Sequence, residues 1–128
     1  MGFFNRFREL PLGNSELESV QENLHYLLNA REGYGSVIRD YGIGNYYAQP
    51  DTIHAVRALL REVLDDIARY EPRLKVLSLE TKGRDSNMKL HLELIGLIGG
   101  ARYLFKLSFD QIYNHFSVDS AHDLRTME

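Results

Sequence analysis

The first amphipathic stretch of the chain predicts a helix. Its apolar side chains fall on one stripe, and acidic and amide residues occupy the opposite side. The stripe comprises Leu17, Val20, Leu24, Leu27 and Leu28. Ser15 with Glu18 three residues later resembles a capping box, and Asn14 is the alternative cap. We expect this helix to end near Arg31, before the glycine at Gly33.

A second helix is predicted from the spacing of another apolar stripe. That stripe comprises Ile53, Val56, Leu60, Val63, Leu64 and Ile67. Asp51 or Thr52 is placed to cap the helix. Pro72 disfavours helical backbone at the residue before it, so the helix should stop around Tyr70. Between the helices, residues 33–50 hold five glycines or prolines and four tyrosines, which predicts an ordered loop without a long element.

After Pro72 the apolar period changes to two, which predicts strands. Three strands are expected at residues 74–80, 88–94 and 103–109, and a shorter fourth at residues 116–118 is left open. Residues 83–87 form a turn cluster between the first two strands. Gly99 and Gly100 make a tight reversal between the second and the third.

The order helix, loop, helix and strands predicts the fold class. We expect an α+β domain in which two main helices pack on one face of a small antiparallel β-meander of three to four strands. The chain divides into an N-terminal arm (residues 1–14), one domain (residues 15–119) and a frayed C-terminal tail (residues 120–128). The arm is too apolar for a free tail, so its phenylalanines should pack on the domain or on a partner.

Composition narrows the classes of function. The 128 residues are 44% apolar and 26% charged, which fits one globular domain with a core. The net charge of −3 lacks the basic excess typical of nucleic-acid binding. No cysteine is present, which excludes disulfides and thiolate metal sites. Arginines interrupt the apolar residues near the N-terminus, and no apolar run is long enough to span a bilayer. We therefore expect a soluble, cytoplasmic protein without membrane insertion.

No spacing in the chain points to catalysis, a cofactor or a metal. The histidines are His25, His54, His91, His115 and His122. No two of them lie four apart on a predicted helix, which favours scattered surface or satisfied positions over a metal site. The glycine pairs of the predicted loop lack the lysine of a P-loop, and no serine stands in a nucleophile elbow. We expect no catalytic residue, no cofactor and no metal.

Two polar groups stand out as candidate interaction sites. Glu71, Pro72 and Arg73 lie at the junction from the second helix to the first strand, where the proline fixes the backbone. A rigid corner would hold both charges in defined directions; the alternative is a helix stop with two ordinary surface charges. Asn29 and Arg31 lie at the end of the first helix, where they are either a C-terminal cap or an interaction site.

Together these segments resemble the TssE family of type VI secretion baseplate subunits and the related phage-tail baseplate wedge proteins. Residues 19–33 match the family pattern S-V-x-x-N-L-x-x-L-L-N-T-R-x-G, and residues 71–74 match its E-P-R-L turn. Residues 3–7 match its aromatic and basic arm, and residues 41–45 match in part its Y-G-L-P-D segment. The resemblance covers residues 3–118, nearly the whole chain.

The chain departs from the family at Ala30, where Thr is usual, and at Gly44, where Pro is usual. The resemblance implies a structural subunit that docks on the wedge proteins TssF, TssG and TssK and helps to initiate polymerisation of the contractile sheath. It implies that the corner of Glu71, Pro72 and Arg73 faces the helical bundle of the wedge. Sheet edges would receive sheath subunits, because an added strand gains main-chain hydrogen bonds. We expect a monomer when the chain is isolated.

Other functions stay open. One is a wedge protein of a phage tail. Another is a peptidoglycan hydrolase, since the family is often labelled lysozyme-like; that chemistry needs two carboxylates flanking a cleft, one with a raised pKa. A third is a regulatory module that binds a signalling protein. The structural role predicts that Glu71→Ala and Arg73→Ala leave folding intact and abolish baseplate assembly.

Overall fold

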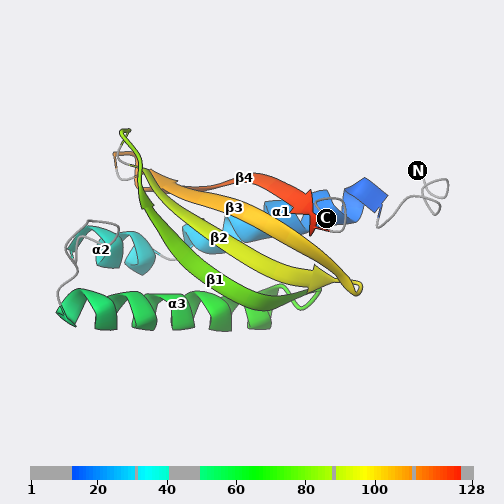
Figure 1. Cartoon of the computed structure of the whole chain (residues 1–128), viewed down its shortest axis with the longest axis horizontal. Coiled ribbons are helices and arrows are strands. Elements are labelled where there is room, and N and C mark those ends of the chain that lie inside the picture. Colours follow the sequence, from blue (N-terminus) through cyan, green and yellow to red (C-terminus); the bar gives the residue numbers. More distant parts are fainter. Residues whose placement is uncertain (1–12, 31, 41–49, 88, 111, 125–128) are drawn as a thin grey trace.

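The computed structural model describes residues 13–30, 32–40, 50–87, 89–110 and 112–124. Within these ranges the helices are α1 (Gly13–Ala30), α2 (Glu32–Asp40) and α3 (Pro50–Tyr70). The strands are β1 (Leu74–Arg84), β2 (Lys89–Ile98), β3 (Ala101–Asp110) and β4 (His115–Asp123). They form one antiparallel sheet in the order β1-β2-β3-β4, so the α+β class and the meander are confirmed, with four strands (Figure 1).

Both long helices begin earlier than the sequence predicted. α1 begins at Gly13, so Ser15 lies inside its first turn and does not precede the helix. α3 begins at Pro50, whose fixed φ and missing N–H suit the first helical position, so the predicted caps of α3 also lie inside the helix. The predicted ends are confirmed, because α1 ends at Ala30 and α3 at Tyr70.

α2 replaces part of the predicted loop, so the prediction that residues 33–50 hold no long element was wrong. Its glycines lower helix propensity, but Tyr34 and Ile38, one turn apart, are both buried in the core. Gly35 permits the close approach of α2 to β3 and to the turn after it, since a Cβ at this position would press on the side chains of Phe109 and Asn114. The remainder of the predicted loop, residues 41–49, lies outside the described residues.

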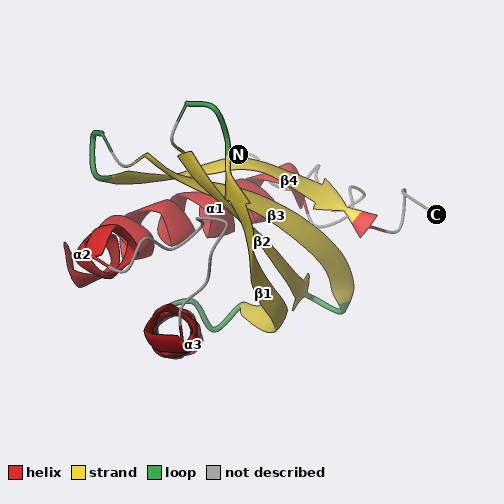
Figure 2. Cartoon of the chain, turned by 60° about the vertical axis from the view of Figure 1, so that its left-hand side comes forward, coloured by secondary structure: helices red, strands yellow, loops and turns green. Residues whose placement is uncertain are grey.

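The core lies between the helices and one face of the sheet. α1 packs along β4, α3 packs along β1, and the helices also contact one another. Figure 2 shows the helices beneath the sheet. Alternate residues of β2, beginning with Leu90, are buried and the others are partly exposed, as the period of two predicted. On α3 the buried apolar residues are Leu59, Val63 and Ile67. Ile53 was predicted on the inward stripe, but it is 42% exposed.

The strands are longer than predicted, because the pairing resumes after each bulge and continues up to the turns. β1 continues to Arg84 through two register shifts. Gly99 and Gly100 form the predicted reversal, with φ values of 58° and 84° that suit glycine. β4 extends to Asp123, so the prediction of a frayed tail over residues 120–128 was wrong for its first four residues; residues 125–128 lie outside the described residues.

Asp85 organises the turn between β1 and β2. Its Oδ1 accepts hydrogen bonds from the amides of Asn87 (2.8 Å) and Lys89 (3.1 Å), and its Oδ2 lies 2.8 Å from His91 Nε2. The hydrogen bond with His91, with those from the amides, lowers the pKa of Asp85 from 3.8 to about 2. A carboxylate with a lowered pKa stabilises the fold above its usual pKa, and this contribution is lost as the pH falls through about 2.

We expect His91→Ala to raise the pKa of Asp85 towards its usual 3.8, because the largest cause of the lowering is removed. An NMR titration of the Asp85 carboxyl carbon measures this pKa directly. His122→Ala is the control, since His122 contacts Ser120 on β4 and does not contact Asp85. An unchanged Asp85 titration in His91→Ala would contradict the assignment.

Candidate functional site

The predicted corner lies where α3 passes into β1. The amide of Glu71 donates to the carbonyl of Ile67 (2.8 Å) and completes the last turn of α3. The amide of Leu74 donates to the carbonyl of Glu71 (3.2 Å) and closes the turn that leads into β1. Pro72 lies exposed at the apex, where its lack of an N–H leaves no donor unsatisfied. The main chain of Glu71 is thus fixed from both sides.

The side chain of Glu71 is fully buried and all of its oxygens are occupied. Its Oε2 accepts from the amide (3.1 Å) and Nε (2.9 Å) of Arg73. Its Oε1 accepts from Arg73 Nη2 (2.7 Å) and from Asn23 Nδ2 (3.0 Å). The guanidinium therefore binds the carboxylate in a bidentate manner, through two parallel hydrogen bonds, which is the strongest geometry for such a pair.

The same group of residues ties α1 to the end of α3. Asn23 Nδ2 also donates to the carbonyl of Tyr70 (3.0 Å), and Arg73 Nη1 donates to Ser19 Oγ (3.0 Å). We call Ser19, Asn23, Glu71 and Arg73 the corner cluster. Sequence reasoning missed its two α1 members. Their signal was the four-residue spacing, which places both side chains on one face of α1 beside the apolar stripe.

The opposite charges of Glu71 and Arg73 each stabilise the ionised form of the other. Burial alone would raise the pKa of Glu71, but the hydrogen bonds from Arg73 and Asn23 and the charge of Arg73 outweigh it and hold this pKa below its usual value. The hydrogen bond to Glu71 is the main cause that raises the pKa of Arg73. Both groups are therefore charged at neutral pH.

Only part of the corner is available to a partner. The side chain of Arg73 is 39% exposed, whereas that of Glu71 is 1% exposed. Pro72 is exposed beside Arg73. The surface of the corner is thus a proline and the outer side of an arginine, with Glu71 fixing that arginine from behind. Because Glu71 is buried and paired, the expectation that Glu71→Ala leaves folding intact does not fit the structure.

Asn29 lies away from the corner and pairs with the edge strand β4. Its Nδ2 donates to the carbonyl of Phe116 (3.0 Å), and its Oδ1 accepts from the amide of Phe116 (2.8 Å). Its Nδ2 also lies 2.8 Å from the carbonyl of His25, one turn earlier on α1. The side-chain amide thus acts as a short strand partner for β4. Arg31, the other residue predicted at this helix end, lies outside the described residues.

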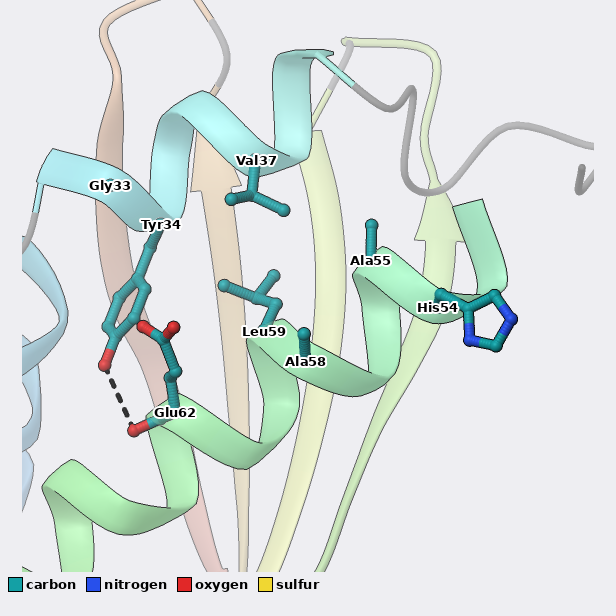
Figure 3. A pocket seen from close by; sticks show the side chains of 8 residues that line it. All are labelled: Gly33, Tyr34, Val37, His54, Ala55, Ala58, Leu59 and Glu62. Atoms are coloured by element: carbon teal, nitrogen blue, oxygen red, sulfur yellow. Dashed lines mark hydrogen bonds between the residues drawn. The ribbon is translucent and has the colours of Figure 1, made fainter. Parts of the chain in front are cut away.

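A hollow between α2 and α3 is the candidate for a substrate cleft (Figure 3). It is lined by Gly33, Tyr34, Val37, His54, Ala55, Ala58, Leu59 and Glu62. Glu62 is the single carboxylate side chain of this lining among the described residues, so a pair of carboxylates does not flank the hollow. The Tyr34 hydroxyl donates to the main-chain oxygen of Glu62 (3.2 Å) and contacts the buried Asp66 carboxylate.

In the described ranges, no three histidine, aspartate or glutamate side chains gather closely enough to hold a metal ion. Among the helices of the described chain, none combines the length and the apolar character that crossing a membrane requires.

Comparison with known proteins gives one match. The family described as baseplate wedge protein gp25 matches residues 14–100. This stretch runs from α1 through β2 and includes the whole corner cluster. Neither the curated proteins nor the solved structures gave a match.

Proposed function

This chain belongs to the baseplate wedge protein gp25 family, which includes the TssE subunits, and we propose that it serves in the baseplate of a type VI secretion system. The family makes it a phage-baseplate-like structural subunit that interacts with other baseplate proteins. In our proposal it docks on the wedge proteins TssF, TssG and TssK and helps to initiate polymerisation of the contractile sheath. It does so in the cytoplasm, without catalysis and without a cofactor.

The observation that carries the docking role is the fixed presentation of Arg73. Its guanidinium is held by two bonds to Glu71 and one to Ser19, so its exposed side has one direction before any partner arrives. A group fixed in its bound geometry loses little conformational entropy on association. Pro72 beside it is equally rigid. This corner is the surface that we assign to the wedge complex.

The sheet supplies the surface for the sheath. β1 and β4 are its edge strands, and an edge strand can accept a strand from a partner through main-chain hydrogen bonds. At the start of β4, Asn29 already occupies the main-chain groups of Phe116. A sheath strand would therefore add to β1 or to the later part of β4.

Binding to a purified TssF–TssG–TssK complex tests the proposal. We expect the wild-type chain to bind, and Arg73→Gln to bind about tenfold more weakly or worse, because the exposed charge is lost. Gln at this position keeps a donor for Glu71 but leaves the buried carboxylate without its charged partner, so circular dichroism must first show that the variant is folded. Arg69→Gln is the matched control, since Arg69 is exposed one turn earlier on α3. Absence of wild-type binding would contradict the function, and normal binding by folded Arg73→Gln would contradict the role of the corner.

A second candidate is a wedge protein of a phage tail, which the description of the matched family favours. The chain would then bind phage wedge proteins in preference to TssF, TssG and TssK. The hydrolase alternative has less support, because the hollow between α2 and α3 lacks a flanking carboxylate pair among its described lining residues. Peptidoglycan cleavage by the purified chain would contradict the non-catalytic role.

A further inference from the structure

The face of the sheet that turns away from the helices carries apolar side chains at one end. On β2, Ile95 and Leu97 alternate with buried residues and are partly exposed. Ile95 pairs with Leu104 of β3, so the two side chains lie side by side on this face. Leu77, at a bulge of β1, is 47% exposed. We call Leu77, Ile95, Leu97 and Leu104 the outer patch.

The outer patch is apolar, whereas the exposed face of such a sheet is ordinarily polar. An antiparallel sheet with one face in the core ordinarily has polar side chains on the other face. The middle of the same face, next to Ile95, follows that rule, because Lys82 lies 3.0 Å from Glu80 and 3.9 Å from Glu93. Figure 2 shows the helices on the far side of the sheet from this face. Contiguous apolar surface of this kind is typical of a binding site.

Two cations border the outer patch. Lys75 and Arg102 pair with Leu97 from its two neighbouring strands, and both are exposed. Within the described part of the chain neither makes an ion pair. Lys75 follows Arg73 by two residues, so the outer patch begins beside the corner assigned to the wedge complex. This end of the sheet is therefore both apolar and positively charged.

Charge distinguishes the occupants that could cover this surface. Residues 1–12 contain Arg6 and Arg8 against Glu9, so this arm would place an excess of positive charge beside two cations. A second copy that packed the same face against itself would oppose Lys75 and Arg102 to their own equivalents. A partner segment with carboxylates suits the surface better than either.

We propose that the outer patch binds an acidic amphipathic helix of another baseplate subunit. Its apolar stripe covers Ile95 and Leu104, which pair across adjacent strands about 5 Å apart, and Leu97, which follows Ile95 by two residues on β2. Its carboxylates pair with Lys75 and Arg102. The inference rests on the proposed function for the source of this helix, and it adds a second contact beside the corner.

The test reverses the two cations together, as Lys75→Glu with Arg102→Glu, and measures binding to the purified TssF–TssG–TssK complex. We expect affinity to fall by about tenfold or more and to become less dependent on salt. The control is Arg57→Glu with Arg61→Glu, which makes the same charge change at exposed positions on α3. Absence of wild-type binding overturns this inference and the proposed function together. Normal binding by the Lys75 and Arg102 variant overturns this inference alone.

A photo-crosslinking side chain at Leu104, in otherwise wild-type protein, identifies the occupant without removing any charge. In the assembled wedge we expect crosslinks to a helical segment with an apolar stripe and flanking carboxylates, located by mass spectrometry of the crosslinked peptides. Crosslinks to residues 1–12 of the same chain, crosslinks to a second copy, or a complete lack of crosslinks would each overturn the inference.

Discussion

Glu71→Ala is expected to lower the free energy of unfolding by about 3 kcal/mol or more, because it breaks a buried ion pair by removing one partner. The substitution leaves Asn23 and Arg73 without the acceptor that both share, and it removes one of the hydrogen bonds that join α1 to the end of α3. Urea unfolding of the purified protein, followed by circular dichroism, gives the difference directly.

Two variants distinguish the effect of breaking the buried ion pair from the general effect of losing a glutamate. Glu18→Ala removes an exposed carboxylate from α1 and should change stability by less than about 0.5 kcal/mol. Glu71→Gln keeps the shape and some hydrogen bonds and removes the charge, so we expect an intermediate loss. If Glu71→Ala were no more destabilising than Glu18→Ala, the corner cluster would not hold the fold together.

The pH dependence of stability offers an independent check. The folded pKa of Glu71 lies below its usual 4.5, so its contribution is fully present above that value and is lost as the pH falls through the folded pKa. The wild-type protein should therefore lose stability more steeply on acidification than Glu71→Gln, which has no carboxylate at this position to protonate. Equal slopes for the two proteins would contradict the lowered pKa.

The sheet was largely predictable because its local pattern and its tertiary environment agree. Leu90, Leu92 and Leu94 alternate with polar residues in the sequence and are all buried in the structure. α2 was missed because two glycines only one residue apart, Gly33 and Gly35, indicate a loop. Its stability comes from the burial of Tyr34 and Ile38 in the core, which a local pattern of nine residues does not reveal.

The corner was found from the sequence, but its internal arrangement was not. Pro72 marks the junction because its effect on the preceding residue is local. A glutamate and an arginine beside it are expected on the surface, since charged residues are seldom fully buried. Glu71 can be buried because Asn23 of α1, which lies 48 residues earlier in the sequence, donates a hydrogen bond to its carboxylate. Such a contact exists only once the helices have packed on the sheet.

The corner and the outer patch are neighbouring surfaces at one end of the molecule. The corner presents an arginine fixed by Glu71 and Ser19, whereas the outer patch presents apolar area with exposed cations at its border. Rigid polar contacts specify orientation, and desolvated apolar area supplies most of the affinity of an interface. A partner that engaged both surfaces would be held more tightly and in one orientation.

Asn29→Leu is expected to lower the free energy of unfolding by about 2 kcal/mol, the second largest effect that we predict. Leucine has nearly the shape of asparagine but cannot pair with the amide and the carbonyl of Phe116, so two main-chain groups of β4 lose their partner. Gln21→Leu is the control on α1, because it adds the same apolar side chain at a position that makes no such pairing with the described strands.

Amide hydrogen exchange at Phe116 directly tests the hydrogen bond between this amide and the Asn29 side chain. In the wild-type protein this amide donates to Asn29 Oδ1 on the open side of β4, so its protection depends on that single side chain. We expect exchange to accelerate most in Asn29→Leu and less in Asn29→Asp, because aspartate keeps the acceptor for the Phe116 amide although its second oxygen then faces the carbonyls of His25 and Phe116. The amides that β3 and β4 exchange with each other should stay protected in both variants. If Phe116 were equally protected in Asn29→Leu, the asparagine would not be closing this edge of the sheet.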